Sequence, residues 1–184
     1  MKLEGPFVSP MQILFERPHL LPAAVAVAGV GALAVALAAQ YWGGLEPCVL
    51  CIHQRYAHGA AAAVALLALF FPAQSAAWRG LVALGALAFL AGAAIAFFHV
   101  GVEQHWWRGT AACHAPSFES GLSLEELREQ MLNTRFVPCD EVPWALFGIS
   151  MAGYNFLASL VLGLMVLWAV RMTAPSRRQA GGAA

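Results

Sequence analysis

Residues 20–39 read LLPAAVAVAGVGALAVALAA and carry no charged side chain. About 20 such residues are enough for a helix to cross the hydrocarbon core of a bilayer. The whole chain of 184 residues shares this character, since 60% of it is hydrophobic and only 11% is charged, against roughly 25% charged in an ordinary soluble domain. This composition excludes a soluble globule and a disordered chain, which would be poor in apolar residues. The formal net charge of zero leaves no basic surface for nucleic acid. The sequence therefore predicts an integral membrane protein.

Three further apolar stretches are long enough to cross a bilayer, and with the first they predict four transmembrane helices. We expect these spans at about residues 20–42, 52–71, 80–102 and 143–170. The first run exceeds the 7–15 residues of a signal-peptide core, so we expect it to remain as a span. The predicted fold is all-α: a four-transmembrane-helix bundle forming a single integral membrane domain over residues 1–184. Two outer loops, at about 43–51 and 103–142, connect its helices on one side.

The loop charges predict the orientation of this bundle. Six of the ten basic residues fall in the two terminal segments and the turn after residue 71, which four spans place on one side. The other side holds eight of the ten acids, namely Glu46, Glu103, Glu119, Glu125, Glu126, Glu129, Asp140 and Glu141. Because cytoplasmic loops carry the excess of Lys and Arg, we expect both termini in the cytoplasm. We also expect four tryptophans at the outer interface: Trp42, Trp106, Trp107 and Trp144.

All four cysteines lie in the outer loops. Cys48 and Cys51 form a CxxC directly before the second span, and Cys113 and Cys139 lie in the second loop. None is on the cytoplasmic side, where a reducing thiol pool opposes disulfides. The loops suggest Cys48–Cys51 and Cys113–Cys139 as resting pairs, although four cysteines allow three pairings. A thiolate at a helix N-terminus is stabilised by the helix dipole, and Arg55 lies one turn beyond Cys51 on the same face. An arginine on the outer side is best explained by an anionic or electron-accepting neighbour.

Other chemistry for the CxxC motif is less well supported. A c-type haem site needs histidine directly after the second cysteine, where this chain has Ile52. A zinc site could draw on the cysteines with His53, His105 or His114, but the spacing of the second pair is unlike a zinc ribbon. We therefore expect no metal. Two inert disulfides would explain the cysteines but not the CxxC beside a membrane arginine.

The second outer loop is longer than a connector needs, and loops of that length are usually functional. Ser123-Leu124-Glu125-Glu126 has the S-x-x-E form of a capping box, and apolar residues follow it at helical spacing. We expect a short amphipathic helix on the membrane surface between Cys113 and Cys139.

Several motifs of the chain together resemble those of the disulfide bond formation protein B (DsbB) family of bacterial inner-membrane oxidoreductases. Cys48-Val49-Leu50-Cys51-Ile52-His53-Gln54-Arg55 is similar to the family's CxLCxxxR signature. The segments His99-Val100-Gly101-Val102-Glu103 and Pro138-Cys139-Asp140-Glu141-Val142-Pro143-Trp144 also resemble the family, as does Cys113 between them. The resemblance covers about residues 15–172 and includes all four cysteines.

The resemblance implies a quinone-dependent thiol oxidase. It implies that a periplasmic thioredoxin-like (DsbA-like) carrier forms a mixed disulfide at Cys113, with Cys139 as the partner cysteine. Electrons would then pass to Cys48–Cys51, and Cys51 would meet a membrane quinone, ubiquinone or menaquinone. Arg55 could stabilise negative charge on the quinone oxygens, and His99 could donate a hydrogen bond or relay a proton. The resemblance places the protein in the bacterial inner membrane, with its cysteines on the periplasmic side.

Other functions stay open from the sequence alone. One is a sibling of the same family that serves a single client. Another is a vitamin-K-epoxide-reductase-like enzyme, against which the early position of the CxxC counts. The third is non-enzymatic: a membrane scaffold stapled by disulfides or binding a metal.

Overall fold

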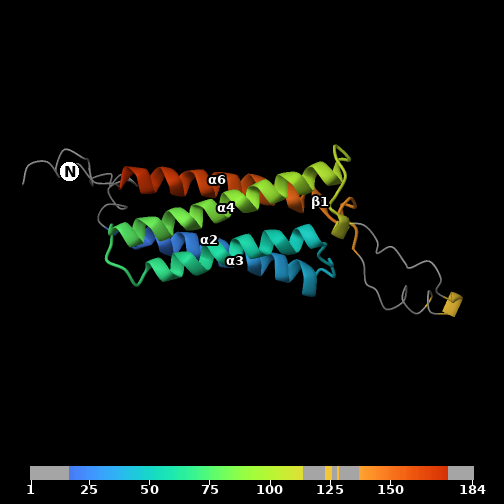
Figure 1. The fold of residues 1–184 in the computed structure, drawn as a ribbon, viewed down its shortest axis with the longest axis horizontal. Helices are drawn as coiled ribbons and strands as arrows, with labels where there is room; N and C mark the ends of the chain where they lie inside the picture. Colours follow the sequence, from blue (N-terminus) through green and yellow to red (C-terminus); the bar gives the residue numbers. More distant parts are fainter. Residues whose placement is uncertain (1–16, 114–122, 126–127, 129–136, 174–184) are drawn as a thin grey trace, which may run out of the picture.

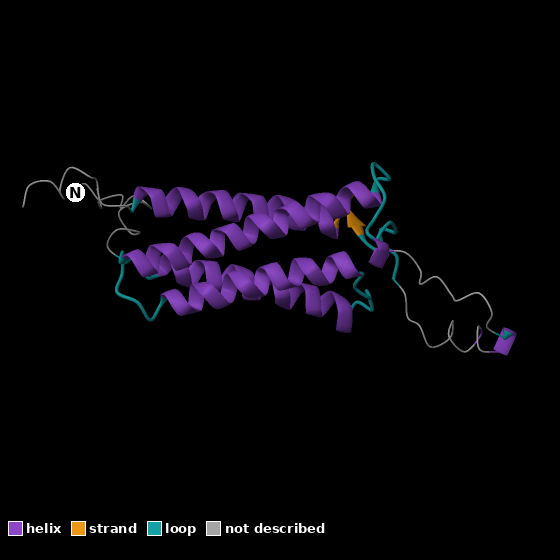
Figure 2. Ribbon diagram, viewed as in Figure 1, coloured by secondary structure: helices purple, strands orange, loops and turns teal. Residues whose placement is uncertain are grey.

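The computed structural model describes residues 17–113, 123–125, 128 and 137–173, and most of these residues are helical. Figure 1 shows the long helices running side by side. They are α2 (Leu20–Tyr41), α3 (Val49–Ala68), α4 (Ala76–Glu103) and α6 (Met151–Met172). Two small elements, the 3-10 turn η1 (Ala111–Cys113) and the hairpin β1 (Ala145–Leu146) with β2 (Ile149–Ser150), lie at one end of the bundle (Figure 2). The chain is therefore a helical bundle, as the sequence predicts.

Small residues let the helices approach closely. A Cβ added to Gly92 of α4 would lie 3.1 Å from the Cβ of Ala57 on α3. A Cβ added to Gly29 of α2 would lie 2.8 Å from the carbonyl oxygen of His58, also on α3. Such close contacts through small residues are typical of helices that pack within membranes.

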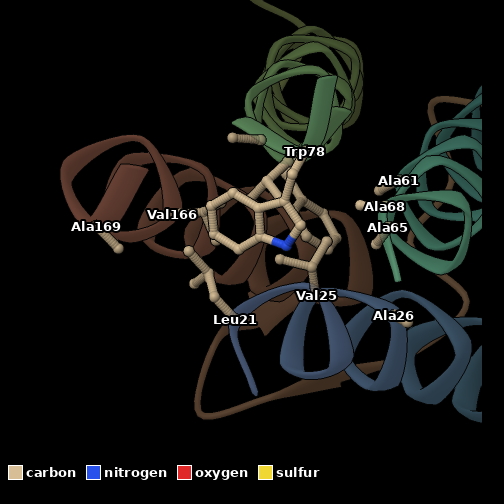
Figure 3. Packing of buried hydrophobic residues seen from close by; sticks show 12 residues of the cluster. Leu21, Val25, Ala26, Ala61, Ala65, Ala68, Trp78, Val166 and Ala169 are labelled. Atoms are coloured by element: carbon tan, nitrogen blue, oxygen red, sulfur yellow. The ribbon is translucent and has the colours of Figure 1, made fainter. Parts of the chain in front are cut away.

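The larger apolar core lies toward the end of the bundle where α4 begins. Trp78, near the start of α4, is completely buried there. Figure 3 shows its indole among Leu21 and Val25 from α2, alanines from α3, and Val166 from α6. Ser75 begins α4 by accepting a hydrogen bond from the Trp78 backbone N–H. This core fixes one end of the four helices against each other and leaves the opposite end for the cysteines.

Among the described residues, three helices are long and apolar enough to cross a membrane: α2, α4 and α6. The remaining helix, α3, is 20 residues long but carries His53, Gln54, Arg55 and His58 in its first half. These polar residues lower its hydropathy. The composition of the helices thus supports a multi-pass membrane protein, while the crossing by α3 stays a proposal.

The fourth helix begins later than the sequence suggested. We expected a span from residue 143, but α6 starts at Met151, so the expectation was wrong for residues 143–150. Phe147 and Gly148 have positive φ angles of 51° and 77°, as both central residues of a type I′ hairpin turn require. The hairpin ends at Ser150, whose side chain accepts a hydrogen bond from the Gly153 N–H and so caps the helix.

Three other boundaries differ by a few residues from the expected spans. α3 begins at Val49 rather than at 52, because Cys48 is its N-cap. It ends at Ala68 rather than at 71, and α4 already begins at Ala76 rather than at 80. The predicted amphipathic helix of the second loop falls largely outside the described residues, which include only Ser123, Leu124, Glu125 and Arg128 of that stretch.

Candidate redox site at one end of the bundle

The first cysteine pair lies at the N-terminus of α3. Cys48 has extended backbone angles and is the N-cap residue, and its sulfur accepts a hydrogen bond from the Cys51 backbone N–H over 3.4 Å. The two sulfur atoms lie 3.2 Å apart as free thiols. Cys48 is buried, whereas Cys51 is partly exposed. The CxxC spacing thus turns one sulfur into the cap of the helix and leaves the other open to approach.

The environment of Cys48 favours its thiolate. The hydrogen bond with the Cys51 side chain lowers the pKa of the Cys48 thiol most, burial raises it, and a hydrogen bond with His99 lowers it again, to about 4. A thiolate with unsatisfied helix N–H groups beside it is the expected result at a helix start. We expected Cys51 to be the stabilised thiolate, but in this reduced arrangement it is Cys48 that accepts the hydrogen bonds.

His99 joins the two cysteine pairs. It lies near the end of α4 and is buried. Its Nε2 lies 3.5 Å from the Cys48 sulfur and 3.2 Å from the carbonyl oxygen of Cys139. A carbonyl oxygen can only accept, so Nε2 carries the proton and donates. One imidazole N–H is therefore shared between a cysteine of the first pair and a cysteine of the second.

The second cysteine pair is closed. Cys113, in η1, and Cys139 form a disulfide with a Cα–Cα distance of 5.3 Å. The structure thus has the pairing that the loops suggest for the second pair, while the first pair is open. Cys113 and Cys139 are both buried and belong to one apolar cluster with Cys48, Leu50 and Val102. All four cysteines consequently meet at one end of the bundle.

A cavity gives access to Cys113. It has a volume of about 300 Å³ and is lined by Val102, His105, Trp106, Trp107, Arg108, Gly109, Cys113 and Asp140. Cys113 contributes to this lining and Cys139 does not. Gly109, in the same lining, packs closely on the Cys113 side chain, since a Cβ added there would lie 2.7 Å from the Cys113 Cβ. Of the two bonded cysteines, Cys113 is therefore the one that lines the cavity.

Arg55 is directed toward α2. One guanidinium nitrogen donates to Gln40 Oε1 over 2.6 Å and the other donates to the Ala36 carbonyl oxygen over 3.2 Å. A cation near the C-terminal turns of a helix is favoured by the helix dipole. From the sequence we expect an anionic or electron-accepting neighbour for Arg55, and the two acceptors on α2 are not predicted. The two bonds use only two of the five N–H groups that a guanidinium offers, and Arg55 is partly exposed.

Sequence reasoning gave no role to four polar residues near the site. Gln54 and Asn155 form a hydrogen-bonded chain with His99, and Ser150 donates to the Glu103 carboxylate over 2.5 Å. Glu103 in turn lies 3.9 Å from His99 Nε2. The signal was available, because polar residues four apart in otherwise apolar helices share a face. His53 is exposed.

Cys48, Cys51 and His99 lie close enough to hold a metal ion, with their ligand atoms within 4.8 Å of one another. A metal would need an unprotonated Nε2 on His99, however, and that nitrogen faces the Cys139 carbonyl oxygen. The surrounding hydrogen bonds of a metal-binding histidine normally fix the opposite tautomer, with the free nitrogen toward the metal. The donor set therefore suits a thiolate better than a metal.

Comparison with known proteins gives one consistent result. The family model described as "Disulfide bond formation protein DsbB" matches residues 18–169. A disulfide bond formation protein B of Azoarcus is 30% identical over 145 residues, which are 74% of this chain and 82% of the relative. The same-named proteins of Verminephrobacter eiseniae and Aromatoleum aromaticum are 34% identical over 161 residues (82% and 84%) and 33% identical over 157 residues (80% and 87%).

Proposed function

Because the chain belongs to the DsbB family of disulfide bond formation proteins, we propose that it oxidises a periplasmic DsbA-like dithiol carrier and passes the electrons to a membrane quinone. Its role in disulfide formation follows from the family; the carrier, the quinone and the residue roles are our proposal. The observation that carries the proposal is the shared contact of His99 with Cys48 and with the Cys139 backbone. It supports direct exchange between the two cysteine pairs.

The first step takes place at Cys113. A carrier thiolate attacks the Cys113 sulfur, the Cys113–Cys139 bond breaks, and Cys139 leaves as a thiolate. A mixed disulfide between the carrier and Cys113 results. The second carrier thiol then attacks its own mixed-disulfide sulfur, which releases the oxidised carrier and leaves Cys113 as a thiolate. Exchange of this kind needs access to the attacked sulfur, and the cavity beside Cys113 supports that choice.

The second step transfers the two electrons to the first pair. The Cys139 thiolate attacks Cys48 of a Cys48–Cys51 disulfide, and Cys51 leaves. Cys113 then attacks Cys139, re-forming the second disulfide, and Cys48 leaves as a thiolate. A leaving thiol of low pKa leaves faster, and the pKa of Cys48 is about 4. The product is a reduced first pair beside a closed second pair, the arrangement of the structure.

The last step regenerates the Cys48–Cys51 disulfide. A quinone, ubiquinone or menaquinone, would supply the oxidising power by accepting two electrons and two protons. The residues at the start of α3 fit such an acceptor, because Cys51 is partly exposed and Arg55 is one turn away. The two hydrogen bonds of Arg55 to α2 use two of its five N–H groups. Arg55 would stabilise negative charge on an acceptor oxygen as it develops. As Cys48 and Cys51 form their disulfide bond, the two electrons given up by the two sulfur atoms would pass to the quinone.

The same proposal includes the location. We place the four helices in the bacterial inner membrane with both termini in the cytoplasm, from the charge of the loops. Figure 1 is compatible with this, because the cysteine-bearing loops lie at one end of the bundle and the α3–α4 connection at the other. The outer end also carries the exposed rings of Trp42 and Trp106, and indoles are favoured at the membrane interface.

The test is a quinone-reduction assay with the full chain in bilayer discs. A reduced thioredoxin-like carrier and either ubiquinone or menaquinone are added, and the absorbance of the oxidised quinone is followed. We expect catalytic loss that disappears in Cys51→Ser and persists in His53→Ala, a matched change of an exposed residue on the same turn. A reduced carrier that lacks its second cysteine should accumulate as a mixed disulfide with Cys113 of the native chain, because the thiol that would release it is absent.

A negative result would be equally informative. No loss of either quinone, with the fold and the cysteines intact, would refute the proposed oxidase and favour a disulfide-stapled scaffold. Quinone reduction by the native chain, without a trapped mixed disulfide when the carrier lacks its second cysteine, would refute the assigned path through the second pair and leave the quinone step standing.

A further inference from the structure

A chain of buried side-chain hydrogen bonds leads from His99 across three helices. Gln54 Nε2, on α3, lies 3.1 Å from His99 Nδ1 on α4 and also donates to the Leu50 carbonyl oxygen over 3.2 Å. Asn155 Nδ2, on α6, donates to Gln54 Oε1 over 2.5 Å. Asn155 Oδ1 in turn accepts from Ser159 over 3.0 Å. The chain thus connects the redox site to the interior of the bundle.

The partners fix the direction of every bond in this chain. The Leu50 carbonyl oxygen can only accept, so the Gln54 atom beside it must be the NH₂ group. That NH₂ group also faces His99 Nδ1, which therefore accepts and carries no proton. The Gln54 oxygen is left to accept from the Asn155 NH₂ group, whose own oxygen accepts from the Ser159 hydroxyl. Each assignment agrees with the next.

The opposite side of the imidazole gives the same answer independently. The Cys139 carbonyl oxygen, 3.2 Å from Nε2, requires a proton on Nε2. A neutral imidazole carries one proton, so a proton on Nε2 and a free lone pair on Nδ1 are the same state. In a histidine, the hydrogen bond made by one ring nitrogen often decides whether the other nitrogen carries the proton. Here the amide of Gln54 takes that role.

We propose that Gln54, held by Asn155, is a positioning residue that keeps the Nε2–H of His99 directed at the Cys48 sulfur and the Cys139 carbonyl oxygen. The functional role of Gln54 rests on the proposed exchange between the cysteine pairs. The structural claim concerns only the protonation and orientation of one imidazole. The groups that face Cys48 are Cys51 from α3, His99 and Glu103 from α4, and the Cys139 backbone from the second loop.

The first measurement is the ¹⁵N spectrum of histidine-labelled, reduced full-length protein in bilayer discs, with His99→Gln to assign the signal. We expect Nδ1 of His99 to show the shift of an unprotonated acceptor nitrogen and Nε2 the shift of an N–H donor. A protonated Nδ1 in the native protein would overturn the proposal. This result needs no mutation of Gln54, so it decides even where a variant does not fold.

The second measurement is the pH dependence of Cys48 alkylation, read by peptide mass spectrometry. In Gln54→Met, of similar volume but without the amide, we expect the midpoint to rise by about one pH unit, a tenfold loss of thiolate at fixed pH. In Gln54→Glu the carboxylate can only accept and so requires a proton on Nδ1, while the Cys139 carbonyl oxygen still requires one on Nε2. His99 then becomes an imidazolium, and the midpoint of Cys48 should fall below the native one. Ser159→Ala, at the far end of the chain, should leave it unchanged.

Other outcomes would count against the inference. An unchanged midpoint in Gln54→Met, or an equal rise in all three variants, would mean that these residues act only in packing. Because neither measurement uses a carrier or a quinone, the inference can fail while the proposed oxidase activity stands, and the reverse also holds.

Discussion

A methyl group added at Gly109 should make the Cys113–Cys139 disulfide easier to reduce. The added Cβ would lie 2.7 Å from the Cys113 Cβ and 3.1 Å from its sulfur. The first distance is about 0.7 Å short of ordinary contact, which begins near 3.4 Å. Overpacking of this kind costs typically about 1–3 kcal/mol. The disulfide holds Cys113 in place, so the strain falls mainly on the oxidised form and is relieved when the bond opens.

The expected shift follows from the two-electron couple. Since about 1.4 kcal/mol corresponds to about 30 mV, a strain of about 1–3 kcal/mol makes the potential about 20–60 mV less negative. The assay is equilibration with glutathione buffers in a Cys48→Ala, Cys51→Ala background, with the disulfide fraction read by thiol labelling. Gly80→Ala is the control, because its Cβ meets nothing within 4 Å. An unshifted potential in Gly109→Ala, or the same shift in the control, would refute the reasoning.

Three further predictions concern the same end of the bundle. The pKa of Cys48, about 4, lies below the ordinary thiol value, so its thiolate persists above that pH. The stability that the thiolate contributes is complete above the ordinary thiol pKa and is lost progressively as the pH falls from there through about 4. The alkylation rate of Cys48 should be nearly flat from pH 5.5 to 8, where an ordinary thiol gains roughly 200-fold; a gain of that size would contradict the assignment. Gly101→Ala should displace Trp107, whose indole ring occupies the place of the added Cβ, and break its 2.9 Å bond to the Phe98 carbonyl oxygen; unchanged tryptophan fluorescence would argue against it. Arg55→Met should slow quinone reduction while the carrier still forms its mixed disulfide at the native rate; equal slowing of both steps would assign Arg55 to the packing of α2 on α3.

The long apolar runs made the helices predictable. A stretch such as residues 20–39 has no stable alternative to a helix in an apolar environment, where every backbone group must be bonded within the segment. The same applies to the placement of the cysteines, because loops between consecutive long helices return to the same end. Family motifs then supplied the likeness that the comparisons confirm.

The contacts between distant segments could not be predicted. The position of Cys48 as the N-cap depends on one backbone angle, and the turn of Arg55 toward Ala36 depends on how α2 lies against α3. The hairpin before α6 arises from two positive φ angles, one of them at Phe147, a residue type that rarely adopts them. Gly148 favours such a turn, but Phe147 before it does not, and the apolar residues around the pair are equally typical of a helix.

The polar face of α3 also bears on how the chain is assembled. If α3 stood alone in lipid, Gln54 would keep only its bond to the Leu50 carbonyl oxygen. Its other bonds, and the bond of His58, come from His99 on α4 and Asn155 on α6. On the proposed crossing, α3 would depend on these neighbours to leave water, and the short connection to α4 would allow the two helices to enter the membrane as a hairpin. Docking of α6 would then supply Asn155, so a chain in which α6 has docked wrongly would leave the amide of Gln54 and the imidazole of His58 without that partner.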